Sequence, residues 1–200
     1  MIVDAETQVV VMQVVVVVDK KEVIKKYEHI KNKFEEFSLE NEFSFVKRLG
    51  RENFWSEDYS KKVIDEYLKF CTLSLFVNHG ITPSDEVDQV WHLHLQYTDH
   101  YINIFCKELL QKNFYHGPTK GGTSEKQKYN CQYEETLKSY KKYFGKPNPK
   151  YWPSNKVRFG DSIYHQRVNI KNNFVISKEV FILFCFIMFS SLFLNIINLL

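Results

Sequence analysis

Apolar residues recur at three- and four-residue spacing through most of the chain, which is the pattern of amphipathic α-helices. In the stretch 57–78 they occupy so much of the helical circumference that we expect it to form the central helix of a bundle. The expected helices span residues 20–37, 43–49, 57–78, 83–98, 99–109 and 124–144. The pattern therefore predicts an all-α fold, a small bundle of about five to six helices whose aromatic residues fill its core.

Short polar motifs predict where these helices begin and end. Ser56 is placed to cap the central helix, and Thr82 followed by Pro83 predicts an N-cap with proline at the first helical position. Ser124 with Gln127 has the spacing of a capping box. The expected helix ends are marked by Gly50, Gly80 and Gly145.

The C-terminus is the most apolar part of the chain. Val180–Leu200 contains no charged residue, and only two serines and two asparagines interrupt its apolar run. As a helix these residues would extend about 31 Å, which matches the hydrocarbon core of a bilayer. We therefore predict a single transmembrane helix; a buried core helix is the alternative. Lys and Arg outnumber acids between residues 150 and 179, so the positive-inside rule predicts a cytoplasmic N-terminal domain.

The run Val9–Val18 is apolar too, but ten residues are too few to cross a bilayer. No cation precedes it, which argues against a secretory signal, and its β-branched residues favour a strand or an aggregation-prone extension. The expected organisation is a Val-rich extension over 1–19, a helical domain over 20–160, a basic juxtamembrane linker over 161–179 and a transmembrane helix over 180–200.

Composition and charge narrow the class of function. Two hundred residues are enough for one ordinary domain. The chain has 27 Lys and Arg against 24 Asp and Glu, a formal net charge of +3 that is too weak and too evenly mixed to indicate nucleic-acid binding. The four cysteines contain no C-x-x-C pair and predict reduced, buried thiols, although a bridge between Cys106 and Cys131 stays open.

The densest set of ionisable and aromatic residues lies between Asp85 and His100. On a helix His94 shares the buried stripe with Trp91, whereas His92 lies about 200° away, on a polar stripe with Asp88. The two histidines therefore cannot ligate one ion from a regular helix. The structural interpretation makes His94 a hydrogen-bonded core residue, Trp91 an interior anchor, and His92 a surface partner of Asp88.

The functional interpretation is a metal site. In it Asp88 and His92, one helical turn apart, or His94 with His116 from a later loop, supply ligands to a divalent transition metal such as zinc. The candidate ligands are Asp88, His92, His94 and His116. The segment Lys120–Gly122 could bind an anion through its backbone amides, but it lacks the full phosphate-loop spacing and fits a plain loop as well.

Several stretches resemble a known family: RLGRENFWS at 48–56, VIDEYLKF at 63–70, TPSDEVDQVWHLHLQYT at 82–98 and HGPTKGG at 116–122. The chain resembles the glycine-rich domain protein-like family, and in particular its bacterial membrane-anchored relatives, over roughly residues 43–159. The family's acid, Trp and two His fall on Asp88, Trp91, His92 and His94, and its P-T-x-G-G loop falls on Pro118, Thr119, Gly121 and Gly122.

The resemblance implies a fold and a membrane context more than an activity, because the family's function is largely unassigned. Relatives often carry two consecutive histidines before the loop, where this chain has Tyr115 and His116, and no glycine-rich tail is present. Two functions follow as expectations. The first is an interaction or scaffold module at the membrane, with the lipid bilayer and a protein as partners. The second is a metal-binding domain or metal-dependent enzyme.

Overall fold

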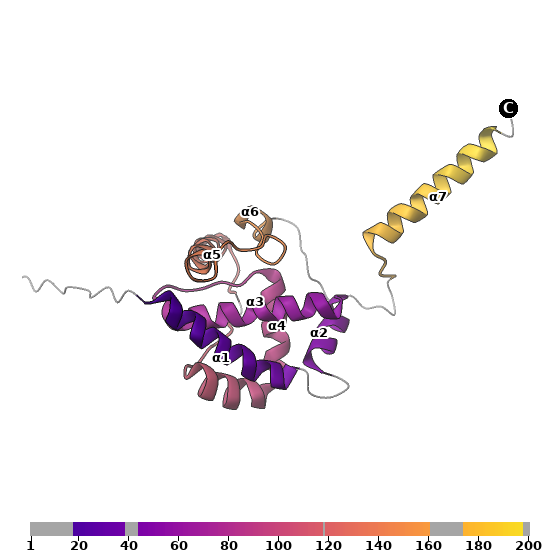
Figure 1. Ribbon diagram of the computed structural model, residues 1–200. Coiled ribbons are helices and arrows are strands. Elements are labelled where there is room, and N and C mark those ends of the chain that lie inside the picture. Colours follow the sequence, from indigo (N-terminus) through magenta and orange to yellow (C-terminus); the bar gives the residue numbers. More distant parts are fainter. Residues whose placement is uncertain (1–17, 39–43, 118, 161–173, 198–200) are drawn as a thin grey trace, which may run out of the picture. The chain divides into compact units, whose positions relative to one another are not determined.

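The computed structural model describes residues 18–38, 44–117, 119–160 and 174–197, and it divides into two units, residues 1–164 and 165–200. Every element of these described ranges is a helix, so the all-α class is confirmed (Figure 1). Residues 1–17 of the expected extension, Pro118 and residues 161–173 of the expected linker lie outside the described residues.

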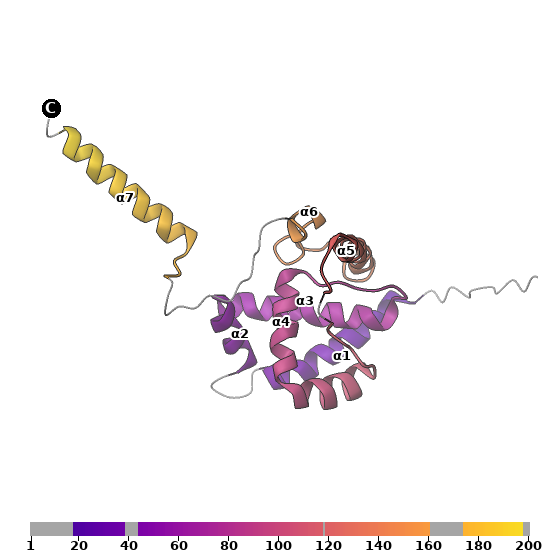
Figure 2. The ribbon, with the colours of Figure 1, turned by 180° about the vertical axis from the view of Figure 1, so that it is seen from behind.

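Helix α3 (Glu57–Phe76) is the central helix of the N-terminal unit, as its apolar pattern predicts. It begins at the expected cap, where the Ser56 hydroxyl accepts a hydrogen bond from the Tyr59 backbone N–H at 3.2 Å. In Figures 1 and 2 it runs between α5 and the unlabelled π-helix η1. The helices packed against it are α1 (Lys20–Ser38), α2 (Phe45–Asn53), α4 (Asp85–Gln96), η1 (His100–Leu110) and α5 (Thr123–Phe144).

Aromatic rings fill the core between these helices. Phe34 of α1 is fully buried, and its ring meets Phe45, Phe105 and His94 edge to face, with centroids 5.1–5.9 Å apart. Such edge-to-face pairs add to the free energy gained from burying the rings, by roughly 0.5–1.5 kcal/mol each. The aromatic residues therefore act as core packing, as the sequence indicates.

One buried carboxylate connects α3 to the C-terminal part of this unit. The Oε2 atom of Glu66 accepts hydrogen bonds from the Tyr140 hydroxyl at 2.5 Å and from the Trp152 indole N–H at 2.7 Å. Its Oε1 atom pairs with Lys69 at 3.0 Å. A buried charge is tolerated only when it is paired and hydrogen-bonded, so Glu66 fixes α5 and the segment before the short helix α6 (Asn155–Arg158) onto α3.

Helix α4 begins two residues later than its sequence predicts. The N-cap is Ser84, whose hydroxyl accepts from the Val87 N–H at 3.2 Å, and the prediction of Thr82 is wrong. Thr82 is buried instead, where its backbone N–H donates to the Thr136 hydroxyl of α5 at 3.0 Å. Thr82, which the local sequence favours as the cap, is thus used for a tertiary contact with α5.

Three further boundaries differ from the prediction. Helix α3 ends at Phe76, with Val77 as its C-cap, before the expected end marked by Gly80. Helix α2 continues through Gly50 and ends at Asn53, because Phe54 adopts the left-handed conformation (φ 57°) that closes the helix. Helix α5 begins after Gly122 without a side-chain cap, so the capping box of Ser124 and Gln127 is not used. The expected end at Gly145 is confirmed, with φ 90° there.

The four cysteines are free thiols, and the burial of two differs from the prediction, since Cys185 is only partly buried. Cys71 and Cys106 are buried, as expected of small apolar side chains, but Cys131 is exposed on α5. The bridge between Cys106 and Cys131 that the sequence left open is not formed.

The C-terminal unit contains the apolar helix α7 (Lys178–Ile197). Its large apolar side chains are exposed, among them Phe181, Ile182 and Phe186. Over the described residues, however, no helix combines the length and the apolar character that crossing a membrane requires. The structure therefore supports an apolar helix in this region but does not identify it as the transmembrane helix expected over 180–200.

Candidate metal centre

Helix α4 directs the two histidines of the W-H-x-H element to opposite sides, as the helical spacing predicts. His94 is fully buried together with Trp91, whereas the side chain of His92 is 48% exposed. Asp88 lies one turn before His92 on the same face, and its carboxylate is 3.7 Å from the His92 Nε2 atom. The outer face of α4 therefore presents an acid and an imidazole side by side.

A third group comes from the segment that follows η1. The Phe114 ring stacks on Trp91, with centroids 4.4 Å apart and planes 7° apart. The Tyr101 hydroxyl accepts a hydrogen bond from the Trp91 indole N–H at 2.9 Å and donates one to the Phe114 carbonyl. Two residues later, the rings of His116 and Trp91 meet edge to face, with centroids 4.6 Å apart. This anchoring brings the His116 ring to the outer face of α4.

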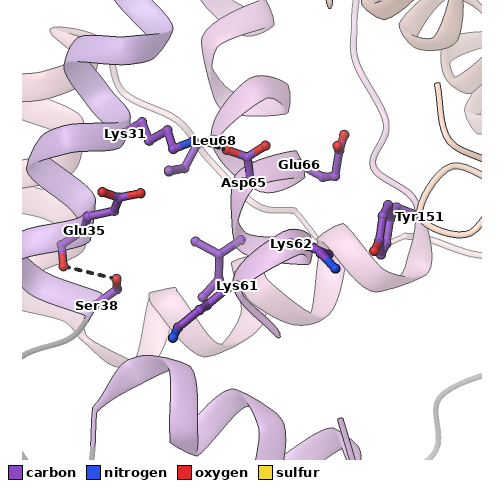
Figure 3. A pocket seen from close by; sticks show the side chains of 10 residues that line it. Lys31, Glu35, Ser38, Lys61, Lys62, Asp65, Glu66, Leu68 and Tyr151 are labelled. Atoms are coloured by element: carbon purple, nitrogen blue, oxygen red, sulfur yellow. Dashed lines mark hydrogen bonds and ion pairs between the residues drawn. The ribbon is translucent and has the colours of Figure 1, made fainter. Parts of the chain in front are cut away.

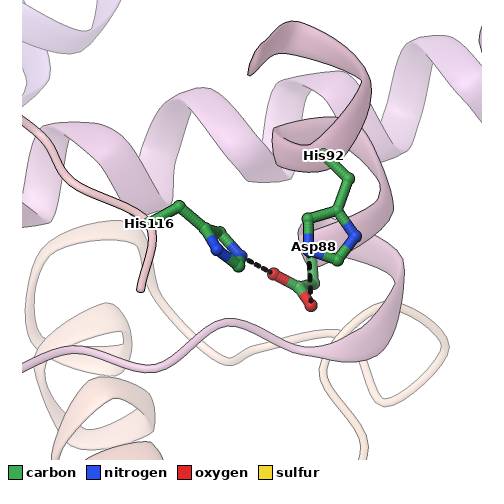
Figure 4. A group of neighbouring side chains, drawn as sticks. All are labelled: Asp88, His92 and His116. Atoms are coloured by element: carbon green, nitrogen blue, oxygen red, sulfur yellow. Dashed lines mark hydrogen bonds and ion pairs between the residues drawn. The ribbon is translucent and has the colours of Figure 1, made fainter. Parts of the chain in front are cut away.

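The three side chains converge on one point (Figure 4). The His116 Nε2 atom is 2.8 Å from one carboxylate oxygen of Asp88, and the His92 Nε2 atom approaches the other oxygen. Counting one ligand atom from each residue, the three atoms lie within 4.8 Å of one another. The structure thus brings together three of the four residues that the sequence proposes as ligands: Asp88, His92 and His116.

These distances fit a small divalent ion. Zinc binds imidazole nitrogen and carboxylate oxygen at about 2.0–2.2 Å, which places neighbouring ligand atoms of a tetrahedral site about 3.3 Å apart. The two separations from Asp88, 2.8 Å to His116 and 3.7 Å to His92, lie on either side of that value. Imidazole and carboxylate ligands suit zinc and its transition-metal neighbours. The donor set therefore suits such an ion, and its three ligand atoms, all within 4.8 Å of one another, lie close to the required spacing.

His94, the fourth proposed ligand, is not brought to this cluster. Its Nδ1 atom shares a hydrogen bond with the Tyr67 hydroxyl at 2.9 Å, and its Nε2 atom shares one with His100 Nδ1 at 2.8 Å. Burial, with a smaller contribution from His100, lowers the pKa of His94 well below its ordinary value. His94 is therefore a hydrogen-bonded core histidine, and both of its partners are side chains.

Sequence reasoning did not identify the residues that position His116. Trp91 is the interior anchor that the sequence predicts, but its contacts with Tyr101 and Phe114 depend on the path of the chain after η1. The signal available beforehand was the aromatic character of both positions. Nothing in local spacing relates position 91 to position 114.

The glycine loop makes hydrogen bonds within itself and to α5. The Gly121 N–H donates to the Thr119 hydroxyl at 3.1 Å, and the Lys120 N–H contacts Glu125 of α5 at 3.4 Å. Gly121 and Gly122 have φ values of 75° and 88°, which favour glycine. Two of the amides proposed for anion binding thus already have partners, one in the loop and one in α5, which favours the plain-loop interpretation.

A cavity of about 380 Å³ lies elsewhere, between α1 and α3 (Figure 3). The cations on its walls already have acidic partners: Lys31 pairs with Asp65 at 3.0 Å, and Lys61 and Lys62 pair with acids one turn away on α3. Little uncompensated charge is left there to recognise a ligand. The cluster on α4 is therefore the stronger candidate site.

Comparisons with protein-family models, with curated proteins and with solved structures found no match. The resemblance to the glycine-rich domain protein-like family accordingly stays a prediction.

Proposed function

We propose that this chain is a small helical domain that binds one divalent transition metal ion, such as zinc, through Asp88, His92 and His116. The observation that carries the proposal is the convergence of three donor atoms within 4.8 Å from two segments separated along the chain. Two of the donors share one face of α4 at one-turn spacing, and the third is delivered by an anchored segment.

The residues that hold the three donors in position also contribute to metal affinity. Residues that orient metal ligands commonly change affinity by about 10- to 100-fold when they are mutated. Here Trp91 and Tyr101 hold the segment that carries His116, so little conformational entropy is lost when an ion binds. The Asp88 carboxylate, already placed between the two imidazoles, supplies the negative charge that attracts a cation.

The proposal is tested by metal titration of the full-length chain in detergent micelles. Co²⁺ is the probe, because it gives d–d absorption bands and quenches the fluorescence of a nearby indole such as Trp91. We expect one Co²⁺ per chain, displaced by Zn²⁺. The variants His92→Ala and His116→Ala should bind more than about 10-fold more weakly, since each removes a ligand.

The matched control is His29→Ala, which removes an exposed histidine from α1. This variant should keep the affinity of the parent. Parent-like affinity in both His92→Ala and His116→Ala would refute the site, whatever metal remained bound to the chain.

A second candidate function is favoured by a different observation. We propose that residues 180–200 anchor the protein in a lipid bilayer with the N-terminal unit in the cytoplasm, where it acts as an interaction or scaffold module for a protein partner. The support is the absence of charge from Val180 to Leu200, the exposed apolar side chains of α7 and the preceding excess of Lys and Arg. Membership of the glycine-rich domain protein-like family belongs to this proposal. The two functions are compatible within one chain.

A further inference from the structure

The described residues supply three donors to the cluster on α4, one fewer than a closed tetrahedral site needs. We infer that the ion keeps one coordination position open and that this position takes a monodentate anion of the carboxylate class from outside the domain. The inference rests on the proposed function, because it concerns an ion held by Asp88, His92 and His116.

Among the residues that the structure describes, none adds a further ligand on the inner side of the cluster. That side is closed by Trp91, whose ring faces His116, and by Phe114, which stacks on Trp91. The one polar atom of the indole is an N–H, which cannot ligate a cation, and it already donates to Tyr101. An additional ligand must therefore approach from the other side.

The outer side is open to solvent along His92. The exposed fraction of the His92 side chain is 48%, against 19% for Asp88 and 20% for His116. Tyr115 and Gly117, the chain neighbours of His116, are exposed as well. A ligand from solvent can thus approach the ion beside the His92 ring, with no described segment across its path to that ring.

Charge decides which class of ligand is favoured. A divalent ion with one carboxylate and two neutral imidazoles carries a net charge of +1, which one monodentate anion neutralises. Asp85, one turn before Asp88, is paired with Arg158 at 2.5 Å, so its own charge is compensated. The local field at the open position therefore attracts an anion, and a carboxylate oxygen is among the ligands that zinc accepts.

The test uses the full-length chain loaded with Co²⁺ in detergent micelles. Azide should add a charge-transfer band, and acetate should shift the d–d bands, each saturating at one anion per Co²⁺. Acetamide, a neutral molecule of the same size as acetate, should leave the spectrum unchanged. The His29→Ala variant should respond as the parent does.

The outcomes separate the inference from the function on which it rests. If Co²⁺ binds through His92 and His116 but its spectrum ignores both azide and acetate, the open position is refuted while metal binding stands. If Co²⁺ does not bind, or binds equally well without these histidines, the proposed function itself fails.

A second measurement identifies the source of the anion. Light scattering of the Zn²⁺-loaded chain, with and without acetate, distinguishes a side-chain carboxylate of a second copy from a free anion. A zinc-dependent dimer that dissociates on addition of acetate indicates the second copy, and a monomer that binds acetate indicates the free anion. A zinc-dependent dimer that resists saturating acetate would contradict ligation by an exchangeable carboxylate.

Discussion

At the scale of single residues, the contrast between His92 and His94 explains why only one of them lies beside Asp88 and His116. They are two positions apart, yet one is half-exposed beside Asp88 and the other is fully buried against Tyr67 and His100. A helix turns about 200° over two residues, so a pair that looks like one ligand motif is divided between solvent and core. The third ligand therefore has to come from another segment, and His116 occupies that place.

Tyr101 gives a prediction at this scale. Tyr101→Phe removes the hydroxyl that connects the Trp91 N–H to the Phe114 carbonyl and leaves both without that partner. We expect the free energy of unfolding to fall by about 1–3 kcal/mol, as for other buried groups that lose a hydrogen bond. Affinity for Co²⁺ should fall about 10-fold, because the segment carrying His116 is less fixed.

Urea denaturation of the metal-free chain and Co²⁺ titration measure the two effects. The control is Tyr115→Phe, which removes a hydroxyl from an 82% exposed side chain next to His116 and should alter neither quantity. Unchanged Co²⁺ affinity in Tyr101→Phe would show that this hydroxyl does not position the ligand.

At the scale of elements, periodicity predicted more than local motifs did. The 3.6-residue pattern located the central helix and the two faces of α4. It could do so because the side of a helix that is buried in the core carries the apolar residues. Helix caps were less predictable. Thr82, the predicted N-cap of α4, contacts α5 instead, and Ser84 caps the helix. The meeting of Asp88 with His116 depends on the chain's course through η1, which no spacing along the sequence encodes.

The junction of α4 and η1 gives a prediction about pH. Burial lowers the pKa of His100 to about 4, and its ring stacks on Phe37 at 3.6 Å while sharing a hydrogen bond with His94. The unfolded chain takes up this proton near pH 6.5, its ordinary value, and the folded chain only near pH 4. Stability is therefore fully present above pH 6.5 and is lost as the pH falls from 6.5 to 4.

We expect His100 to account for about 1–2 kcal/mol of that loss, allowing for solvent screening of a partly buried ring. Urea denaturation of the metal-free chain across this range should show a shallower loss for His100→Gln, which does not titrate but can still bond His94. His29→Gln, at an exposed position, should follow the parent. Parallel curves for the parent and His100→Gln would rule out this contribution.

At the scale of the whole molecule, the chain comprises a helical unit and a separate apolar helix, and each is described by its own contacts. The cluster of Asp88, His92 and His116 lies entirely within the first unit. If the apolar helix serves as an anchor, truncation should separate membrane anchoring from metal binding.

Deleting residues 178–200 provides that separation. We expect the truncated chain to leave the membrane fraction of cells that express it, because the uncharged apolar helix is gone. Its affinity for Co²⁺ should stay within about two-fold of the parent, since no ligand or supporting residue is removed. Sedimentation and metal titration measure the two outcomes. Continued sedimentation of the truncated chain with membranes would contradict the anchor.

The buried carboxylate of Glu66 constrains the order in which the domain folds during synthesis. During synthesis α3 leaves the ribosome long before Tyr140 and Trp152, the two residues that donate to Glu66. Until then this acid can remain solvated only if α3 keeps that side open to water, because a buried carboxylate without donors is strongly unfavourable. The N-terminal helices can therefore form early, but the last part of the core closes only after Trp152 has left the ribosome.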